Sequence, residues 1–153
     1  MRLAHKLTVL VLAIALLLLL LLLPRPGAGQ SGEDFGDYLV HYSAIATDQL
    51  QADIAREYGI ERSARRGLLN IAVEPKSSAT PHMVNADVSA SVSTLTGHAS
   101  PIAVRETSEN GDIDYLGEFP LQGSGTYRYT VRVTPPGHNQ PYVLRFNQDY
   151  VVD

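Results

Sequence analysis

Residues 127–133 read Tyr-Arg-Tyr-Thr-Val-Arg-Val, so apolar and polar side chains alternate along them without interruption. A second alternation runs through residues 84–92, Val-Asn-Ala-Asp-Val-Ser-Ala-Ser-Val. A period of two is the spacing of a β-strand with one buried face, because successive side chains point to opposite sides of a sheet. The two stretches therefore predict two half-buried strands, with Tyr127 and Tyr129 on the buried side.

Other stretches alternate less regularly and predict five more strands: Tyr38–Ile45, Leu68–Glu74, Ile102–Glu106, Ile113–Phe119 and Tyr142–Phe146. Turn-forming residues separate them. Asn110-Gly111 suits the two positive φ angles of a type I′ turn, within a loop that we expect to be longer than two residues. About seven short strands punctuated by turns predict a mainly β fold, an antiparallel β-sandwich of the immunoglobulin-like kind.

One segment has helical rather than strand spacing. Its apolar residues fall on one face at four-residue steps, at Leu50, Ile54 and Tyr58. Thr47 or Asp48 can cap the start of a helix, and Gly59 can adopt the left-handed conformation after its end. We therefore predict one short helix between the first and second strands.

The first 29 residues differ in character from the rest of the chain. Arg2 and Lys6 precede a run from Leu7 to Leu23 that is apolar except for Thr8, and proline and glycine follow it. This is the pattern of a secretory signal peptide, so we expect a signal peptide over residues 1–29 and one domain over residues 30–153. The alternative is an uncleaved anchor, although such a helix would span only about 25 Å of the roughly 30 Å hydrocarbon layer. Either way we expect the domain to be exported.

The composition of the 153-residue chain excludes several classes of function. It contains no cysteine, hence no disulfide, thiolate metal ligand or cysteine nucleophile. Three of its twelve Lys and Arg residues lie within the first 29, so the remainder carries nine basic and sixteen acidic residues. A domain with a formal charge of −7 has no general attraction to nucleic acid or to an anionic membrane. Membrane contact is expected only through the N-terminal segment, if that segment is uncleaved.

Several short strings occur together that resemble the bacterial family called domain of unknown function 4426. They are Gly36-Asp37-Tyr38, Val40-His41-Tyr42, Tyr58-Gly59-Ile60-Glu61-Arg62-Ser63, Arg66-Gly67-Leu68-Leu69-Asn70, Gly117-Glu118-Phe119-Pro120 and Leu144-Arg145-Phe146-Asn147-Gln148. The resemblance covers nearly the whole exported part. It implies a small exported protein of a Gram-negative bacterium. The family name carries no reaction and no ligand, so the resemblance assigns no residue a role.

Three arginines form the sharpest charged feature of this acidic domain: Arg62, Arg65 and Arg66. They lie between the predicted helix and the strand that begins near Leu68. Guanidinium groups suit bidentate binding of carboxylate or phosphate, so this cluster is our candidate site for an anionic small ligand or an acidic envelope protein. The alternative is that the arginines pair with Glu57, Glu61 or Glu74, or are solvated on a loop.

Residues suited to catalysis or to metal binding do not form a recognisable set. The histidines of the exported part lack strand or helix spacing: His41, His82, His98 and His138. His82-Met83 supplies two donor types that suit copper, but only one methionine lies outside the first 29 residues. There is no Gly-x-Ser-x-Gly elbow and no Ser-x-x-Lys pair. Turn composition accounts for the closely spaced carboxylates, which are Glu106, Glu109, Asp112 and Asp114. We therefore predict no metal, no cofactor and no catalytic residue.

The combined reading is a periplasmic, non-enzymatic interaction or ligand-binding module of unknown specific role. One alternative is a carrier of a small ligand or envelope lipid, which would need a cavity lined by the inward residues of strands 84–92 and 127–133. Another is a small periplasmic hydrolase, which would need a cleft holding a carboxylate or histidine of perturbed pKa.

Overall fold

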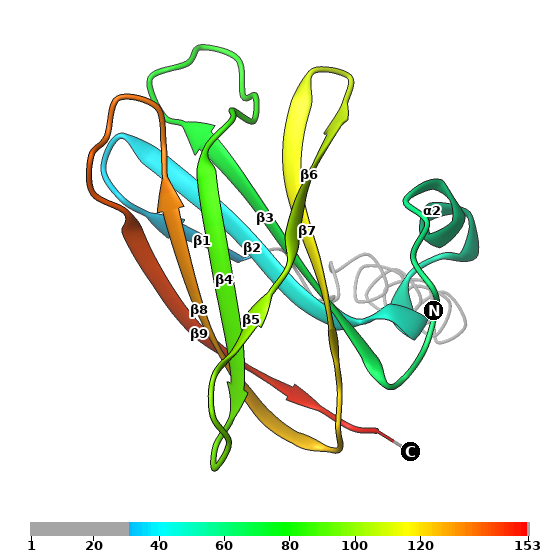
Figure 1. Ribbon diagram of the computed structural model, residues 1–153. Helices are drawn as coiled ribbons and strands as arrows, with labels where there is room; N and C mark the ends of the chain where they lie inside the picture. Colours follow the sequence, from blue (N-terminus) through cyan, green and yellow to red (C-terminus); the bar gives the residue numbers. More distant parts are fainter. Residues whose placement is uncertain (1–30, 153) are drawn as a thin grey trace, which may run out of the picture.

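The computed structural model describes residues 31–152, which form two antiparallel sheets (Figure 1). The predicted signal peptide, residues 1–29, lies outside the described residues. Sheet A has the strand order β1-β2-β3-β7-β6 and contains β1 (Ser31–Asp34), β2 (Tyr38–Ala46), β3 (Arg66–Pro75), β7 (Asp112–Pro120) and β6 (Val104–Glu109). Sheet B has the order β5-β4-β8-β9 and contains β5 (Ser100–Ile102), β4 (Asp87–Thr94), β8 (Gly125–Thr134) and β9 (Tyr142–Tyr150).

The strand order is that of an immunoglobulin-like sandwich. In sheet A, β2, β3, β7 and β6 take the places of immunoglobulin strands A, B, E and D, and β1 adds a hairpin strand at the edge. In sheet B, β9, β8, β4 and β5 take the places of strands G, F, C and C′. The predicted fold class is therefore confirmed, with nine strands among the described residues where about seven were expected.

The hydrophobic core lies between the two sheets. The inward residues of β8 are buried as the alternation predicts, with Tyr129 only 1 % exposed. They pack in one cluster with Leu69 and Ile71 of β3. Burying a side chain of this size contributes about 1.5–3 kcal/mol. The inward side chains of residues 84–92 and 127–133, which a carrier would need to line a cavity, belong to this packed cluster.

The predicted strand Ile102–Glu106 is in fact two strands in different sheets. β5 ends at Ile102 and pairs with β4, whereas β6 begins at Val104 and pairs with β7. The crossing takes place beside Gly117 of β7, where an added Cβ would lie 2.5 Å from Cγ2 of Ile102. The missing side chain of Gly117 thus gives Ile102 room to enter the core.

The Asn110-Gly111 turn joins β6 to β7. Asn110 has a φ of 52° and Gly111 a φ of 92°, which are the two positive angles of a type I′ turn. The expectation of a longer loop is wrong, because β6 ends at Glu109 and β7 begins at Asp112, which leaves a two-residue loop. The hairpin register is fixed accordingly, with Glu109 opposite Asp112.

The predicted helix is present but shorter and capped differently. A 3-10 turn, η1 (Thr47–Gln49), precedes the helix α2 (Ala52–Glu57). Gln51 occupies the N-cap position of α2 and no side chain caps it, so Thr47 and Asp48 are not the caps. The C-terminal prediction is confirmed, since Gly59 has a φ of 67° just after the helix.

Tyr127 fastens the connection between β7 and β8. Its hydroxyl donates to the carbonyl of Gly123 at 3.0 Å and accepts from the backbone N–H of Gln122 at 3.0 Å. Leu121, just before this loop, is only 2 % exposed. A tyrosine near the start of strand F that bonds backbone a few residues upstream is the tyrosine corner of immunoglobulin-like sandwiches.

Candidate functional site

A second apolar cluster lies outside the sandwich, on the outer face of sheet A. The segment that contains η1 and α2 covers this part of the face. The cluster comprises the buried residues Ile60, Leu68 and Leu116 and the partly buried residues Ile45, Leu50 and Tyr58. The side chains that were predicted to share one helix face are therefore turned towards the sheet, although Ile54 stays 38 % exposed.

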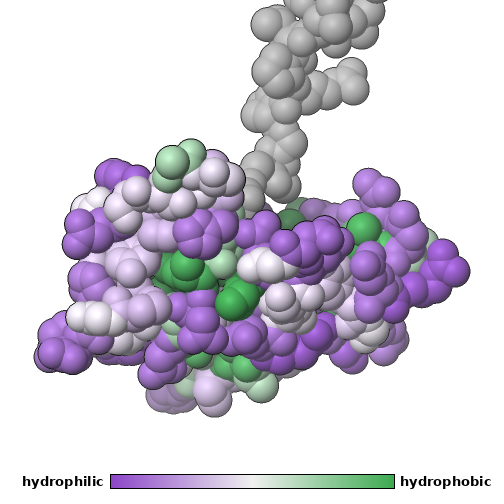
Figure 2. Space-filling model, turned by 90° about the horizontal axis from the view of Figure 1, so that it is seen from above, coloured by the Kyte–Doolittle hydropathy of each residue, from purple (hydrophilic) through white to green (hydrophobic). Residues whose placement is uncertain are grey.

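Between this segment and the sheet lies a hollow of about 170 Å³, which we call the α2 pocket. A cavity of about 150 Å³ holds one benzene molecule, so the pocket accommodates one apolar group of that size. Its wall is formed by apolar residues of the covering segment, mainly Leu50, Ile54 and Ile60. Its floor is the outer face of sheet A, where the polar residues Ser43, Asn70, Thr107 and Asp114 lie beside Ile45, Leu68 and Leu116. In the view from above, hydrophobic residues show among hydrophilic ones in the lobe that carries α2 (Figure 2).

The polar floor contains one group without a partner and one perturbed carboxyl. Asn70 Oδ1 is buried and accepts no hydrogen bond, a state that costs about 1–3 kcal/mol. Burial raises the pKa of Asp114, a hydrogen bond with Asn70 opposes the rise, and the charges of Asp112 and Glu109 add to it. The charge of His41 acts against the rise. An acceptor without a donor thus lies beside a carboxyl whose charged form is disfavoured by burial. This arrangement suits a ligand group that donates hydrogen bonds and carries a positive charge.

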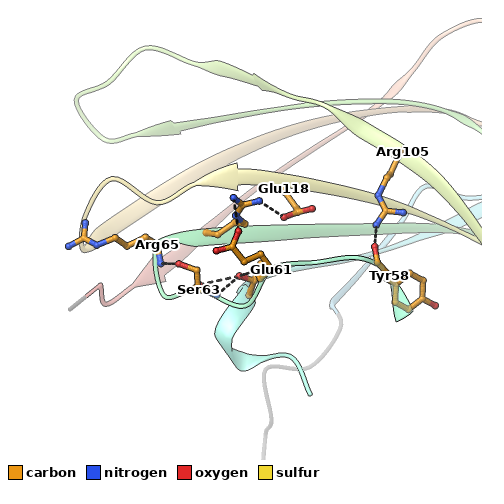
Figure 3. Close-up of polar contacts among 8 residues, drawn as sticks. Tyr58, Glu61, Ser63, Arg65, Arg105 and Glu118 are labelled. Atoms are coloured by element: carbon orange, nitrogen blue, oxygen red, sulfur yellow. Dashed lines mark hydrogen bonds and ion pairs between the residues drawn. The ribbon is translucent and has the colours of Figure 1, made fainter. Parts of the chain in front are cut away.

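Two hydrogen bonds hold the C-terminal end of α2 against the edge strand β6. Arg105 Nη2 donates to the carbonyl of Tyr58 at 2.6 Å (Figure 3). The Tyr58 hydroxyl donates to Glu109 Oε2 at 2.7 Å, and this bond is the largest cause that raises the pKa of Tyr58 to about 12. One wall of the pocket is thereby tied to the sheet at Tyr58.

Thr47 holds the other end of the covering segment. Its side chain is fully buried. The hydroxyl donates to the carbonyl of Glu61 at 2.8 Å, lies 3.1 Å from that of Ser63, and accepts from the Ser63 N–H at 2.9 Å. The role predicted for Thr47 was a helix cap, but its contacts instead fix the chain that follows the helix.

The structure brings two of the three predicted arginines together. A hollow of about 270 Å³ is lined by Arg65 and Arg66 together with Glu118, Phe119 and Pro120. Arg66 pairs with Glu118 at 3.0 Å and with Glu61 at 3.6 Å, so one of the expected acidic partners is present. The Arg62 side chain donates to the carbonyl of Asp48 at 2.6 Å and does not line this hollow.

In the close-up, the Arg65 side chain extends away from Glu61 and Glu118, while its backbone N–H donates to Ser63 Oγ (Figure 3). Binding of an anionic ligand or acidic partner at Arg62, Arg65 and Arg66 stays a prediction. The contacts of Arg66 show what such a partner must displace, because two of its nearest groups are carboxylates.

The histidines occupy separate places in the domain. His41 Nε2 lies 2.6 Å from Glu74 Oε2 on the outer face of sheet A. His138 packs between Tyr38 and Tyr142, and His82 Nδ1 lies 3.2 Å from the Thr80 carbonyl. Within residues 31–152, no three His, Asp or Glu side chains gather as a set of metal ligands.

The carboxylates interpreted as turn residues all belong to strands. Glu106 and Glu109 lie in β6, and Asp112 and Asp114 lie in β7. Glu106 Oε2 accepts from Asn85 Nδ2 at 2.6 Å. Asp112 Oδ1 accepts from the Met83 N–H.

Sequence reasoning placed Asn70 and Asp114 in predicted strands, but it gave Asn70 no role and attributed Asp114 to turn composition. No local motif marks either residue, because the pocket arises from pairing of β3 with β7. The one available signal was the polar residue Asn70 within the otherwise apolar run 68–73.

Comparison with known proteins identifies one family and a common fold. The family model described as domain of unknown function (DUF4426) matches residues 32–153. A crystal structure of a DUF4426 family protein from Pseudomonas aeruginosa PAO1 is 31 % identical, covers 82 % of this chain and 97 % of its own, and superposes with a TM-score of 0.68. No curated protein matches the sequence.

Two structures of FetP from uropathogenic Escherichia coli strain F11 share the fold at low identity. A copper-bound variant is 13 % identical, with 82 % of this chain and 97 % of that chain covered and a TM-score of 0.58. FetP as isolated after expression in the periplasm is 11 % identical, with 80 % and 93 % covered and a TM-score of 0.58. Within residues 31–152 of the present chain, no helix has the length and apolar character needed to span a bilayer.

Proposed function

This chain belongs to the DUF4426 family, and on that premise we propose that it is an exported, non-enzymatic module of the periplasm that binds a small amphipathic amine in the α2 pocket. The basic start and apolar run of the first 29 residues support export. The periplasmic expression of the structural neighbour FetP is consistent with the same compartment.

The observation that carries the proposal is the pairing of Asn70 and Asp114 beneath an apolar wall. An ammonium group offers three donors and a positive charge, so it can satisfy Asn70 Oδ1 and the Asp114 carboxyl together. A charge-assisted hydrogen bond of this kind is roughly twice as strong as a neutral one. The apolar wall, which includes Leu50 and Ile60, would cover the ring or alkyl part of the same ligand.

The hydroxyl groups of the pocket favour binding over catalysis. Thr107 donates to the Asp114 backbone carbonyl at 3.3 Å. Among the described residues, no hydrogen bond joins the Ser43 hydroxyl to a histidine or carboxylate that would activate it. The nearby imidazole of His41 is engaged with Glu74 through Nε2. We therefore do not propose the Ser43 hydroxyl as a nucleophile or His41 as its base.

One FetP variant is copper-bound, and the described part of this chain offers few donors for such an ion. The described imidazole–carboxylate pair, His41 and Glu74, supplies two ligands, and no third His, Asp or Glu joins it among residues 31–152. The trigonal and square-planar copper sites of proteins use three or four donors. These donors do not fit a copper site, so the proposed function involves no metal.

The test is an NMR titration of the protein, purified from the periplasm of an expressing host, with benzylamine. We expect the amide signals of Asn70 and Asp114 to shift, and benzyl alcohol and benzoate to bind less tightly or not at all. Asp114→Asn should weaken benzylamine binding about tenfold, because it removes the charge but keeps the shape. Glu57→Gln is the matched control, since it removes one exposed carboxylate of α2 outside the pocket.

Equal affinity for benzylamine and benzoate would overturn the proposed ligand chemistry. An unchanged affinity in Asp114→Asn would overturn the proposed site. Hydrolysis of ester or amide substrates by the wild-type protein that is lost in Ser43→Ala would instead support the hydrolase alternative.

A further inference from the structure

The outer face of sheet B carries three exposed arginines, independently of the α2 pocket. Arg128 and Arg132 lie on β8, and Arg145 lies on β9 opposite Thr130, midway between them. Diagonal neighbours on adjacent antiparallel strands have Cα atoms about 7–8 Å apart. Arg145 is therefore a diagonal neighbour of both other arginines, and we call the three residues the arginine triangle.

The side chains around the arginine triangle are hydrogen-bonding groups. Ser93, Ser91 and Ser89 of β4 lie opposite Arg128, Thr130 and Arg132. Asn147 of β9 lies opposite Arg128 on the other side. The inward aromatic residues of these strands, Tyr129 and Phe146, stack on each other within the sandwich. The face thus offers guanidinium, hydroxyl and amide groups without an outward aromatic ring on the three strands.

The arginine triangle makes no direct ion pair among the described residues. Arg128, Arg132 and Arg145 form none of the ion pairs present within residues 31–152. In contrast, Arg66 pairs with Glu118 and Lys76 pairs with Asp34.

Two acidic residues of the same face are diagonal neighbours of the outer arginines. Asp87, opposite Thr134, is diagonal to Arg132. Asp149, opposite Thr126 and accepting a hydrogen bond from it, is diagonal to Arg128. Like charges at neighbouring positions of a sheet destabilise it. Three arginines so close together on a domain of net charge −7 therefore favour the binding of an anionic partner, which reduces their mutual repulsion.

A hollow lies beside Arg128 and Arg145, and Arg132 lies outside its lining. Its volume is about 370 Å³, and its polar lining includes Arg128, Arg145, Ser91, Ser93, Thr130 and Asn147. Pockets for small molecules occupy about 300–1,000 Å³, so the hollow has the size for a small ligand.

We propose that this face of sheet B binds a small molecule that carries two or more phosphate groups. The planar guanidinium group forms two parallel hydrogen bonds with a phosphate, and the flanking hydroxyls can donate to the remaining oxygens. The guanidinium groups of Arg128 and Arg145 line the hollow, and each can bind one phosphate group, so a ligand with two phosphates matches the site. The lack of an outward ring disfavours a ligand that binds by stacking of a base.

The test is isothermal titration calorimetry of the periplasmic protein with inorganic pyrophosphate. We expect binding that is at least tenfold weaker in Arg128→Gln/Arg145→Gln and several-fold weaker in Arg132→Gln. The matched control is Arg56→Gln/Lys76→Gln, which removes two exposed charges elsewhere and should keep the wild-type affinity within about twofold. Thermal denaturation checks that every variant is folded. If the double variant is unfolded, the single variant Arg145→Gln, which changes a residue that lines the hollow, provides the test.

Orthophosphate and citrate are control ligands that distinguish recognition of two phosphate groups from a general attraction to anions. Both should bind more weakly than pyrophosphate, the first because it carries one phosphate and the second because it offers carboxylates. Equal losses in the triangle variant and the control variant would overturn the site. Binding to phosphatidylglycerol vesicles without binding to pyrophosphate would overturn the ligand class in favour of a membrane surface.

Discussion

The hydroxyl oxygens of Tyr129 and Tyr150 lie 2.8 Å apart within the core, so that two phenols on neighbouring strands hydrogen-bond to each other. Tyr129 is 1 % exposed and Tyr150 is 5 % exposed. The Tyr150 ring meets Tyr127 and Phe119 edge to face. A buried hydroxyl without a partner costs about 1–3 kcal/mol, so the pairing allows two large aromatic side chains to fill the core without that cost.

The first prediction concerns the coupling of these two phenols. Tyr129→Phe and Tyr150→Phe should each lower the free energy of unfolding by about 1–3 kcal/mol, because each leaves one buried hydroxyl unpaired. The double variant should lose less than the sum of the two single losses. Urea denaturation of the four proteins measures this, and strictly additive losses would contradict the hydrogen bond.

The second prediction is a loss of stability in alkali. Burial raises the pKa of Tyr150 from 10.0 to about 12, although the bond with Tyr129 acts in the opposite direction. Burial also raises the pKa of Tyr129. Between pH 10 and pH 12 the unfolded chain therefore ionises Tyr150 while the folded chain keeps it neutral. The free energy of unfolding is therefore unaffected below about pH 10. As pH rises further it falls by about 1.4 kcal/mol per pH unit for each such tyrosine.

Urea titrations at several pH values check this dependence. Above pH 10 the free energy of unfolding of Tyr150→Phe should decline less steeply than that of the wild type, because one ionising group has been removed. A decline that is equally steep in both proteins would show that other groups cause it.

The third prediction concerns the tyrosine corner. Tyr127→Phe removes the hydroxyl that joins Gln122 and Gly123 to β8, and it should lower the unfolding free energy by about 1–3 kcal/mol. Tyr38→Phe is the control, since its hydroxyl makes a weak contact of 3.4 Å to the Pro136 carbonyl. Chemical denaturation should place the control within about 0.5 kcal/mol of the wild type. Similar losses of unfolding free energy in both variants would show that the hydrogen bonds of the tyrosine corner are not the cause.

Strands with one covered face could be predicted from the sequence, because burial on one side imposes alternation. β4 and β8 follow this rule. β3 alternates poorly for a physical reason, since Leu68 packs under the α2 segment while Leu69 enters the core. β1 could not be predicted, because all four of its residues are exposed and no buried face marks them.

The candidate sites depend on strand register, which alternation does not contain. Arg128 and Arg132 could be placed on one face from their spacing alone. Arg145 joins them only through the pairing of β8 with β9. Asn70 and Asp114 meet through the pairing of β3 with β7, in which Ala72 lies opposite Asp114. The sequence therefore predicted the faces of single strands but not the sites that two strands form together.

The last prediction tests how Thr47 holds the segment that covers the α2 pocket. Thr47→Val keeps the shape of the side chain but leaves the Ser63 N–H and the Glu61 carbonyl without their partner. We expect a loss of about 1–3 kcal/mol in unfolding free energy and faster hydrogen exchange at the Ser63 amide. Thr47→Ser retains the hydroxyl and is the control. If Ser63 exchanges equally fast in both variants, the methyl group of Thr47 rather than its hydroxyl fixes the segment, and the pocket wall is then held by packing.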